Sequence, residues 1–186
     1  MAELYVIGEI VGASGFSSKN LCCKFTFTYG EHWKLHKGEQ TGQTQTDYAS
    51  SDMCVWSHPV DLFFTTTNVI GWPRLAVQVF KIDQYGCYDL EGYGFVQVPL
   101  APGTHNLKIL TWKPTGTKTE EFAKEFLGLT PRLKNESLIA SGDDRKMLRT
   151  ESSGVVHVTL GIIQREFDKQ GIVTKTEKSD GAIGGD

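Results

Sequence analysis

Cys54 and His58 are the candidates for nucleophilic catalysis, because a thiol and an imidazole that converge in space can act together. Cysteine catalysis needs a thiolate, an imidazole that takes its proton, and a third group that orients the imidazole. The pair lies in a Trp-Ser-His-Pro stretch that is typical of a structural turn. No hydrolase elbow, phosphate-binding loop, dinucleotide-binding fingerprint or zinc-protease motif occurs. The sequence therefore predicts a protein without catalytic residues.

His32 and His36 are the candidates for a metal centre, since they are four residues apart. A structural zinc site needs four ligands, and no further ligand stands at a suitable spacing. The cysteines form no Cys-x-x-Cys pair either. We therefore expect surface histidines and free thiols, with no metal and no cofactor. The four cysteines are Cys22, Cys23, Cys54 and Cys87.

An acidic loop in the middle of the chain resembles the third calcium loop of C2 domains. In that loop a strand ends in Asp-x-Asp, and a third Asp follows six residues later. The matching positions here are Lys81, Asp83 and Asp89, so the first carboxylate is replaced by an ammonium group. Calcium needs six to eight oxygen ligands, several of them anionic, and a lysine repels it. Because no Asp or Glu lies between Glu9 and Glu31, where the first loop is expected, we predict a degenerate site without calcium.

The loops at this end of the expected fold also carry aromatic and basic side chains. These are Phe16, Lys19, Tyr85 and Tyr88. Such a mixture can contact lipid headgroups or a protein partner. Ordinary loop residues would look the same, so both interpretations stay open.

Short strands separated by Gly and Pro turns must position these side chains. Apolar and polar residues alternate along several of them, as expected for strands with one buried face. A capping-box sequence from Thr117 to Glu120, followed by Phe122 and Phe126, predicts one short inserted helix at 119–127. The expected strands are 4–11, 21–29, 60–66, 75–80, 93–100 and 155–162.

The size and composition fit one folded domain. The chain has 186 residues, of which 39% are hydrophobic and 11% aromatic, enough for a packed core. A net charge of −3 provides no overall field for nucleic acid. We expect an all-β, C2-like antiparallel sandwich at 1–171 and a polar, disordered tail at 172–186. Neither a signal peptide nor a long apolar run is visible, so we expect a cytoplasmic protein.

Six short strings occur in chain order at 7–16, 42–47, 56–62, 71–75, 92–95 and 102–105. Together they resemble the B9 domain family. Their order makes the resemblance specific, and it extends from Met1 to about Gly171. The resemblance implies a C2-like fold without enzyme activity.

The resemblance also implies a place in the cilium. Members of this family occur at the basal body and transition zone, associated with the cytoskeleton. There they bind the sister proteins B9 domain-containing protein 1 and Meckel syndrome type 1 protein, and act with tectonics in cilium assembly and the membrane diffusion barrier. The resemblance therefore implies a scaffold subunit. The alternative is a C2-type module that binds phospholipid without calcium.

Four tryptophans are the candidate anchors of a protein interface, because large amphipathic rings dominate many such surfaces. A sandwich also has edge strands whose unpaired backbone groups can pair with a related sandwich. Two of the four lie beside Pro-containing turns, where a tryptophan more often locks a loop onto the core. The four are Trp33, Trp56, Trp72 and Trp112.

Overall fold

The computed structural model describes residues 1–48, 51–115, 132–133, 139 and 148–167. Ten strands occur in this part of the chain, and all of their pairings are antiparallel. The predicted helix at 119–127 and the predicted tail at 172–186 lie outside the described residues. The strands are β1 (Ala2–Ser14), β2 (Asn20–Thr28), β3 (Trp33–Lys37), β4 (Thr41–Gln43), β5 (Asp47–Tyr48), β6 (Met53–Thr66), β7 (Arg74–Ile82), β8 (Tyr88–Gln97), β9 (Gly103–Pro114) and β10 (Thr150–Arg165).

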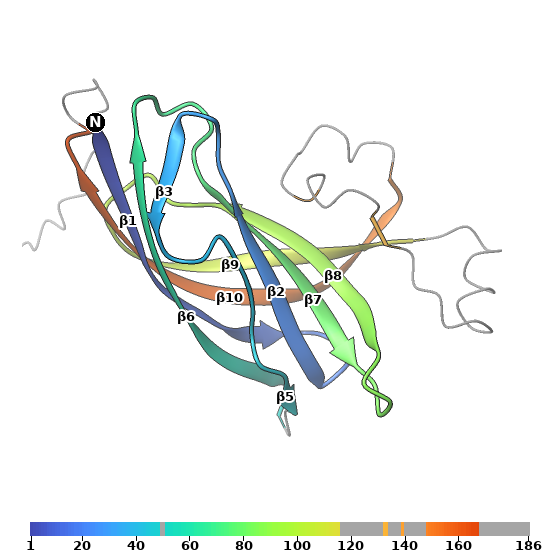
Figure 1. Ribbon diagram of the computed structural model, residues 1–186. Helices are drawn as coiled ribbons and strands as arrows, with labels where there is room; N and C mark the ends of the chain where they lie inside the picture. Colours follow the sequence, from blue (N-terminus) through green and yellow to red (C-terminus); the bar gives the residue numbers. More distant parts are fainter. Residues whose placement is uncertain (49–50, 116–131, 134–138, 140–147, 168–186) are drawn as a thin grey trace, which may run out of the picture.

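The strands form one curled sheet that folds into two facing layers. Their order is β3-β6-β1-β10-β9-β8-β7-β2-β4, and β5 pairs with β2. One layer contains β6, β1 and β10, and the other contains β8, β7 and β2 (Figure 1). The layers are joined where β8 meets β9, through the single residue pair Tyr93 and Trp112. The predicted all-β, C2-like antiparallel sandwich is confirmed.

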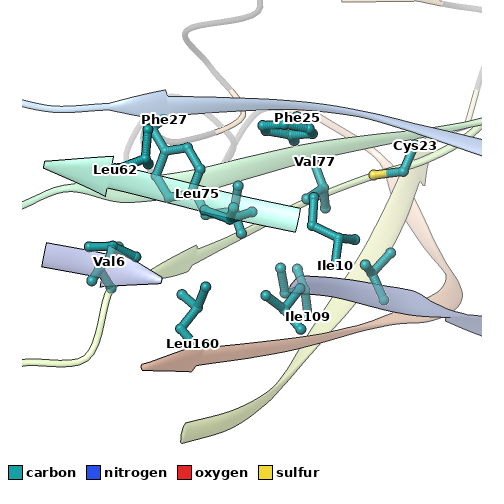
Figure 2. Packing of buried hydrophobic residues seen from close by; sticks show 14 of the residues in the cluster. Val6, Ile10, Cys23, Phe25, Phe27, Leu62, Leu75, Val77, Ile109 and Leu160 are labelled. Carbon is teal, nitrogen blue, oxygen red and sulfur yellow. The ribbon is translucent and has the colours of Figure 1, made fainter. Parts of the chain in front are cut away.

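The main core fills the space between the two layers. Alternate residues of β1, β2, β6, β7 and β10 point into it, which buries their side chains, and the residues between them face outward. Figure 2 shows the side chains of β2 and β7 directed toward those of β1, β6 and β10. The alternation predicted for 21–29, 75–80 and 155–162 is therefore confirmed. The labelled core residues include Val6, Ile10, Phe25, Phe27, Leu62, Leu75, Val77, Ile109 and Leu160.

A second apolar cluster covers the outer face of β7 and β8. Ala76, Leu90 and Tyr93 lie there beneath Ile139, and Leu133 packs against them. The backbone N–H of Leu133 donates a hydrogen bond to the Tyr93 hydroxyl at 3.2 Å. The outer face of β7 and β8 is therefore covered in part by the chain itself.

All six predicted strands occur, but several boundaries differ and some strands were not predicted. β6 begins at Met53 rather than at residue 60, and it contains a bulge where Ser57 has a positive φ of 44°. β8 runs from Tyr88 to Gln97 rather than over 93–100. It ends there because the next amide, that of Val98, donates to the Pro73 carbonyl instead of to a ladder partner. The two longer strands that sequence analysis missed are β3 and β9.

Candidate functional site

The turn between β7 and β8 is organised by Asp83. Its Oδ1 atom accepts hydrogen bonds from the backbone N–H groups of Tyr85 and Cys87, both at 2.8 Å. The Asp83 carbonyl also accepts from the N–H of Gly86 at 3.1 Å. A carboxylate that accepts hydrogen bonds from the backbone amides two and four residues later in the chain stabilises a turn. Turn formation therefore accounts for Asp83 without a metal ligand role.

Lys81 and Asp89 lie opposite each other on the β7–β8 ladder, so their side chains emerge on the same face. The lysine thus brings a positive charge close to Asp89, the last carboxylate of the C2-like pattern. Among the residues that the structure describes, no three His, Cys, Asp or Glu side chains are grouped to hold a metal ion. The degenerate calcium loop remains a prediction, and the position of Lys81 gives it a physical reason.

The four candidate apex residues differ in how much surface they offer. Phe16 is half-buried and packs against the main core. Lys19 is exposed, as is Tyr85, whose side chain is 81% accessible. Tyr88 is 45% accessible and its ring packs edge-on against Phe80. Lys19 and Tyr85 are therefore the two of these four with the most surface available to a ligand.

A cavity of about 470 Å³ lies between the loop at 14–19 and residues 51–52, with Cys54 in its wall. The Cys54 thiol makes weak hydrogen bonds to the carbonyls of Lys19 at 3.7 Å and Asp47 at 3.6 Å. Burial is the main cause that raises the pKa of Cys54 to about 11. The His58 ring instead packs on Phe25, with 5.2 Å between ring centroids. A nucleophilic cysteine needs a lowered pKa, so this environment disfavours the reactive thiolate.

We expect a thiol reagent at about pH 8 to modify Cys87 rapidly, and Cys23 and Cys54 only after unfolding. Cys87 is exposed and the other two are buried. Desolvation raises the pKa of Cys23 and Cys54, so their reactive thiolate forms are depleted at this pH. Mass spectrometry after iodoacetamide treatment, with and without urea, measures the difference. Rapid modification of Cys54 in the folded protein would restore the cysteine-nucleophile hypothesis.

The two candidate metal histidines lie at the edge of the sheet, and both are exposed. His36 belongs to β3, so the helical spacing that would align it with His32 does not occur. Its Nε2 atom lies 2.7 Å from the Thr65 hydroxyl, and its ring packs on Phe63. His36 therefore joins β3 to β6.

Three of the four candidate interface tryptophans are buried inside the domain. Each indole N–H donates to a backbone carbonyl: Trp33 to Ile70 at 3.1 Å, Trp56 to Leu21 at 3.0 Å and Trp72 to Val98 at 2.8 Å. Such bonds tie separate segments of the chain together, as expected of tryptophans that lock loops onto a core. Trp112 is half-buried at the joint between the layers, with its ring 5.5 Å from that of Tyr93.

Sequence reasoning missed an apolar surface on the outer face of β6, β1 and β10. Tyr5 lies between Phe63 of β6 and Ile163 of β10 in the strand register. The rings of Tyr5 and Phe63 stack with centroids 4.5 Å apart. Ile7 and Ile163 are 47% and 55% exposed. We call Tyr5, Ile7, Phe63 and Ile163 the outer-face patch.

The sequence does contain a signal for this patch. Apolar residues run without interruption through Leu4–Ile7, Leu62–Phe64 and Ile162–Ile163. Uninterrupted runs are typical of strands that are covered on both faces, whereas strands with one wet face alternate. Here the described part of the chain covers only one of the two faces.

Most of the sandwich lies in a segment that matches a known protein family. Residues 4–163 match the B9-C2 family, which is described as "Ciliary basal body-associated, B9 protein". The chain belongs to the B9 family. The human B9 domain-containing protein 2 is 47% identical over 173 residues, covering 92% of this chain and 99% of that protein. The Drosophila melanogaster B9 domain-containing protein 2 is 39% identical over 181 residues, covering 94% and 100%.

The B9 family also includes a more distant relative. The mouse B9 domain-containing protein 1 is 31% identical over 185 residues, covering 97% of this chain and 91% of that protein. Among solved structures, the C2A domain of plant Extended Synaptotagmin 1 aligns with a TM-score of 0.43 at 12% identity, covering 87% of this chain and 93% of that chain. The family resemblance seen in the sequence is confirmed.

B9 membership makes this chain a ciliary protein, since the family is described by its association with the basal body. That description names no catalytic activity. In the described ranges, no helix has the length and apolar character that a membrane span requires.

Proposed function

We propose that this B9-family protein is a non-catalytic scaffold subunit of the ciliary transition zone, where it binds other B9 domain proteins. Its partners are B9 domain-containing protein 1 and Meckel syndrome type 1 protein, with tectonics as further members of the assembly. The assembly supports cilium formation and the membrane diffusion barrier. It is cytoplasmic, at the basal body and transition zone, and associated with the cytoskeleton.

The observation that carries this proposal is the exposed outer-face patch on a domain whose polar groups serve the fold. Asp83 forms a turn, Cys54 is held by backbone carbonyls, and Trp56 joins two strands. Clustered apolar residues on an exposed face are typical of a protein interaction site. The similarity to mouse B9 domain-containing protein 1 supports a partner of the same architecture.

The sheet edges favour docking through a face rather than through edge pairing. The strands at the two ends of the sheet are short: β3 has five residues and β4 has three. Short edge strands, and charged residues such as Lys34 on β3, oppose the addition of another strand. The broad face of β6, β1 and β10 therefore offers the larger contact.

A second candidate function is calcium-independent binding to phospholipid. The observation in its favour is the exposure of Lys19 and Tyr85 at the loop apex. An exposed aromatic ring can enter the interfacial region of a bilayer, and a lysine can contact an anionic headgroup. In this alternative the apex, rather than the outer-face patch, would carry the activity.

Purified full-length protein is expected to bind B9 domain-containing protein 1 with a dissociation constant of about 1 μM or tighter. Calorimetry or co-purification measures this, and Meckel syndrome type 1 protein serves as a second probe. Flotation with phosphatidylserine vesicles is expected to be weak and unchanged by calcium or chelator. Strong flotation that is lost in Lys19→Glu and Tyr85→Ser, together with no binding to either protein, would favour the lipid function instead.

A further inference from the structure

The two outer faces of the sandwich are covered to different extents. The β7–β8 face lies beneath Ile139 and Leu133. On the other face, Ile7 and Ile163 remain about half exposed beside the stacked rings of Tyr5 and Phe63. Four apolar residues that are neighbours across three strands form a continuous surface rather than scattered exposed side chains.

The outer-face patch borders a hollow of about 450 Å³ whose floor is glycine. Gly161 of β10 lies opposite Ile7 of β1 and Thr104 of β9. A Cβ atom added at Gly161 would meet only the Ile7 carbonyl oxygen, at 3.2 Å, so space above this residue is open. Ile7 and Ile163 form apolar walls. The hollow has the shape and chemistry to receive an apolar side chain from another molecule.

The charges within these three strands are matched except for one. Glu3 pairs with Arg165 at 3.7 Å, and Asp61 pairs with Lys37 of β3 at 2.8 Å. Glu9, which follows Ile7 on the same face of β1, makes no ion pair with any residue that the structure describes. The rim of the patch therefore carries an unmatched negative charge, which is complementary to a Lys or Arg side chain.

We propose that the outer-face patch docks a protein partner, which inserts an aliphatic or aromatic side chain over Gly161 and places a Lys or Arg beside Glu9. This inference rests on the proposed scaffold function and assigns the surface that performs it. The partner is a protein that presents an apolar residue next to a basic one on an exposed face.

The charge pattern favours a different protein over a membrane or a second copy of the chain as the occupant of the patch. Arg165 and Lys37 already have carboxylate partners, and Glu9 repels anionic headgroups, so the patch lacks the basic cluster that binds such lipids. In a symmetric pair of copies, Glu9 would have to pair with Lys34 of β3 or Lys108 of β9, the exposed lysines on this side of the sheet, and both lie outside the patch. A different protein that carries a basic residue next to its apolar one satisfies Glu9 at the rim of the patch itself.

Three variants test the patch, with B9 domain-containing protein 1 as the probe. Gly161→Val fills the hollow, Ile163→Glu places a charge in the apolar wall, and Glu9→Lys reverses the charge at the rim. Leu110→Glu is the matched control, because Leu110 is 74% exposed on the outer face of β9 but lies outside the patch. Thermal unfolding monitors the fold of each variant, and valine at an open strand position is expected to maintain it.

Each of the three patch variants is expected to weaken binding about tenfold or more, while the control stays within about twofold. Glu9→Lys also separates protein from lipid, because it should weaken protein binding but strengthen flotation with anionic vesicles. If folded Gly161→Val and Ile163→Glu bind with wild-type affinity, the outer-face patch is not the docking surface, whereas the proposed scaffold function still stands. Failure of the wild-type protein to bind would overturn both. A wild-type dimer that Gly161→Val converts to monomer, seen by sedimentation, would assign the patch to a second copy and overturn the inference.

Discussion

Trp56→Ala is expected to lower the free energy of unfolding by about 4 kcal/mol. The Trp56 side chain is 2% exposed, and its indole N–H donates to the Leu21 carbonyl at 3.0 Å. Removing the indole leaves a cavity in the core and deprives a buried carbonyl of its donor. Thermal unfolding followed by circular dichroism should show a fall in Tm of about 8–16 °C.

Two comparison variants divide this loss into its parts. Trp56→Phe keeps an aromatic ring in the core but removes the N–H donor, so a loss of about 1–3 kcal/mol is expected. Val55→Ala changes the neighbouring side chain, which is 51% exposed, and should alter stability by about 0.5 kcal/mol or less. A Trp56→Ala protein within about 1 kcal/mol of wild type would show that the tryptophan does not hold the layers together.

The large effect is expected because Trp56 lies where the two layers close. β6 belongs to one layer and β2 to the other, and the two strands are not neighbours in the sheet. Side chains make the connection: Gln45 donates to the Trp56 carbonyl at 2.6 Å and Asp47 accepts from the Val55 amide at 2.8 Å. Trp56 provides the apolar part of this closure. Its loss acts on the fold, whereas Gly161→Val acts on the surface, so the two should reduce cellular function for different reasons.

The most clearly predicted strands share one physical property: apolar inward residues recur at every second position over several repeats. Phe25 and Phe27 alternate with Lys24 and Thr26 in β2, and the buried face follows directly. β9 was missed because its pattern is mixed. Leu110 points outward and is 74% exposed, so the apolar residues of this strand do not all mark its buried face.

Sequence analysis favoured loop-locking for Trp56 and Trp72, which lie beside Pro-containing turns, but it could not name their partners, because burial depends on contacts distant in sequence. Trp56 reaches Leu21, 35 positions away, and Trp72 reaches Val98, 26 positions away. An interface tryptophan and a buried one have the same ring and the same donor. The turn role of Asp83, which sequence analysis did not name, depends on local contacts instead, since both of its partners lie within four residues and the chain has a turn glycine there.

The outer-face patch illustrates the opposite case, in which the sequence signal existed but its meaning depended on the topology. The run Leu4–Ile7 indicates a strand that is buried on both faces. Only the strand order shows that β1 lies between β6 and β10, which brings Tyr5, Phe63 and Ile163 together. Three short apolar runs, separated in the sequence by many residues, thus become one surface.

Gly12→Ala is expected to lower the free energy of unfolding by about 3 kcal/mol. A Cβ atom at Gly12 would lie 2.0 Å from the carbonyl oxygen of Cys54 and 3.2 Å from the Cα of Val55. Both are backbone atoms, so no side-chain rotation relieves the contact, and β1 must move away from β6 at the bulge. Because β1 also pairs with β10, the displacement disturbs the centre of its layer. A fall in Tm of about 6–12 °C measures the effect.

Gly161→Ala is the matched control, because it removes a glycine from a strand that pairs with the same β1. Its Cβ would meet only the Ile7 carbonyl oxygen, at 3.2 Å, and a small backbone adjustment accommodates that contact. Both substitutions reduce the conformational freedom of the unfolded chain to a similar extent. The difference between their Tm values therefore isolates the close approach of β1 to β6. Equal Tm values would show that β1 and β6 can move apart at the bulge without loss of stability. The close approach at Gly12 would then not require a glycine.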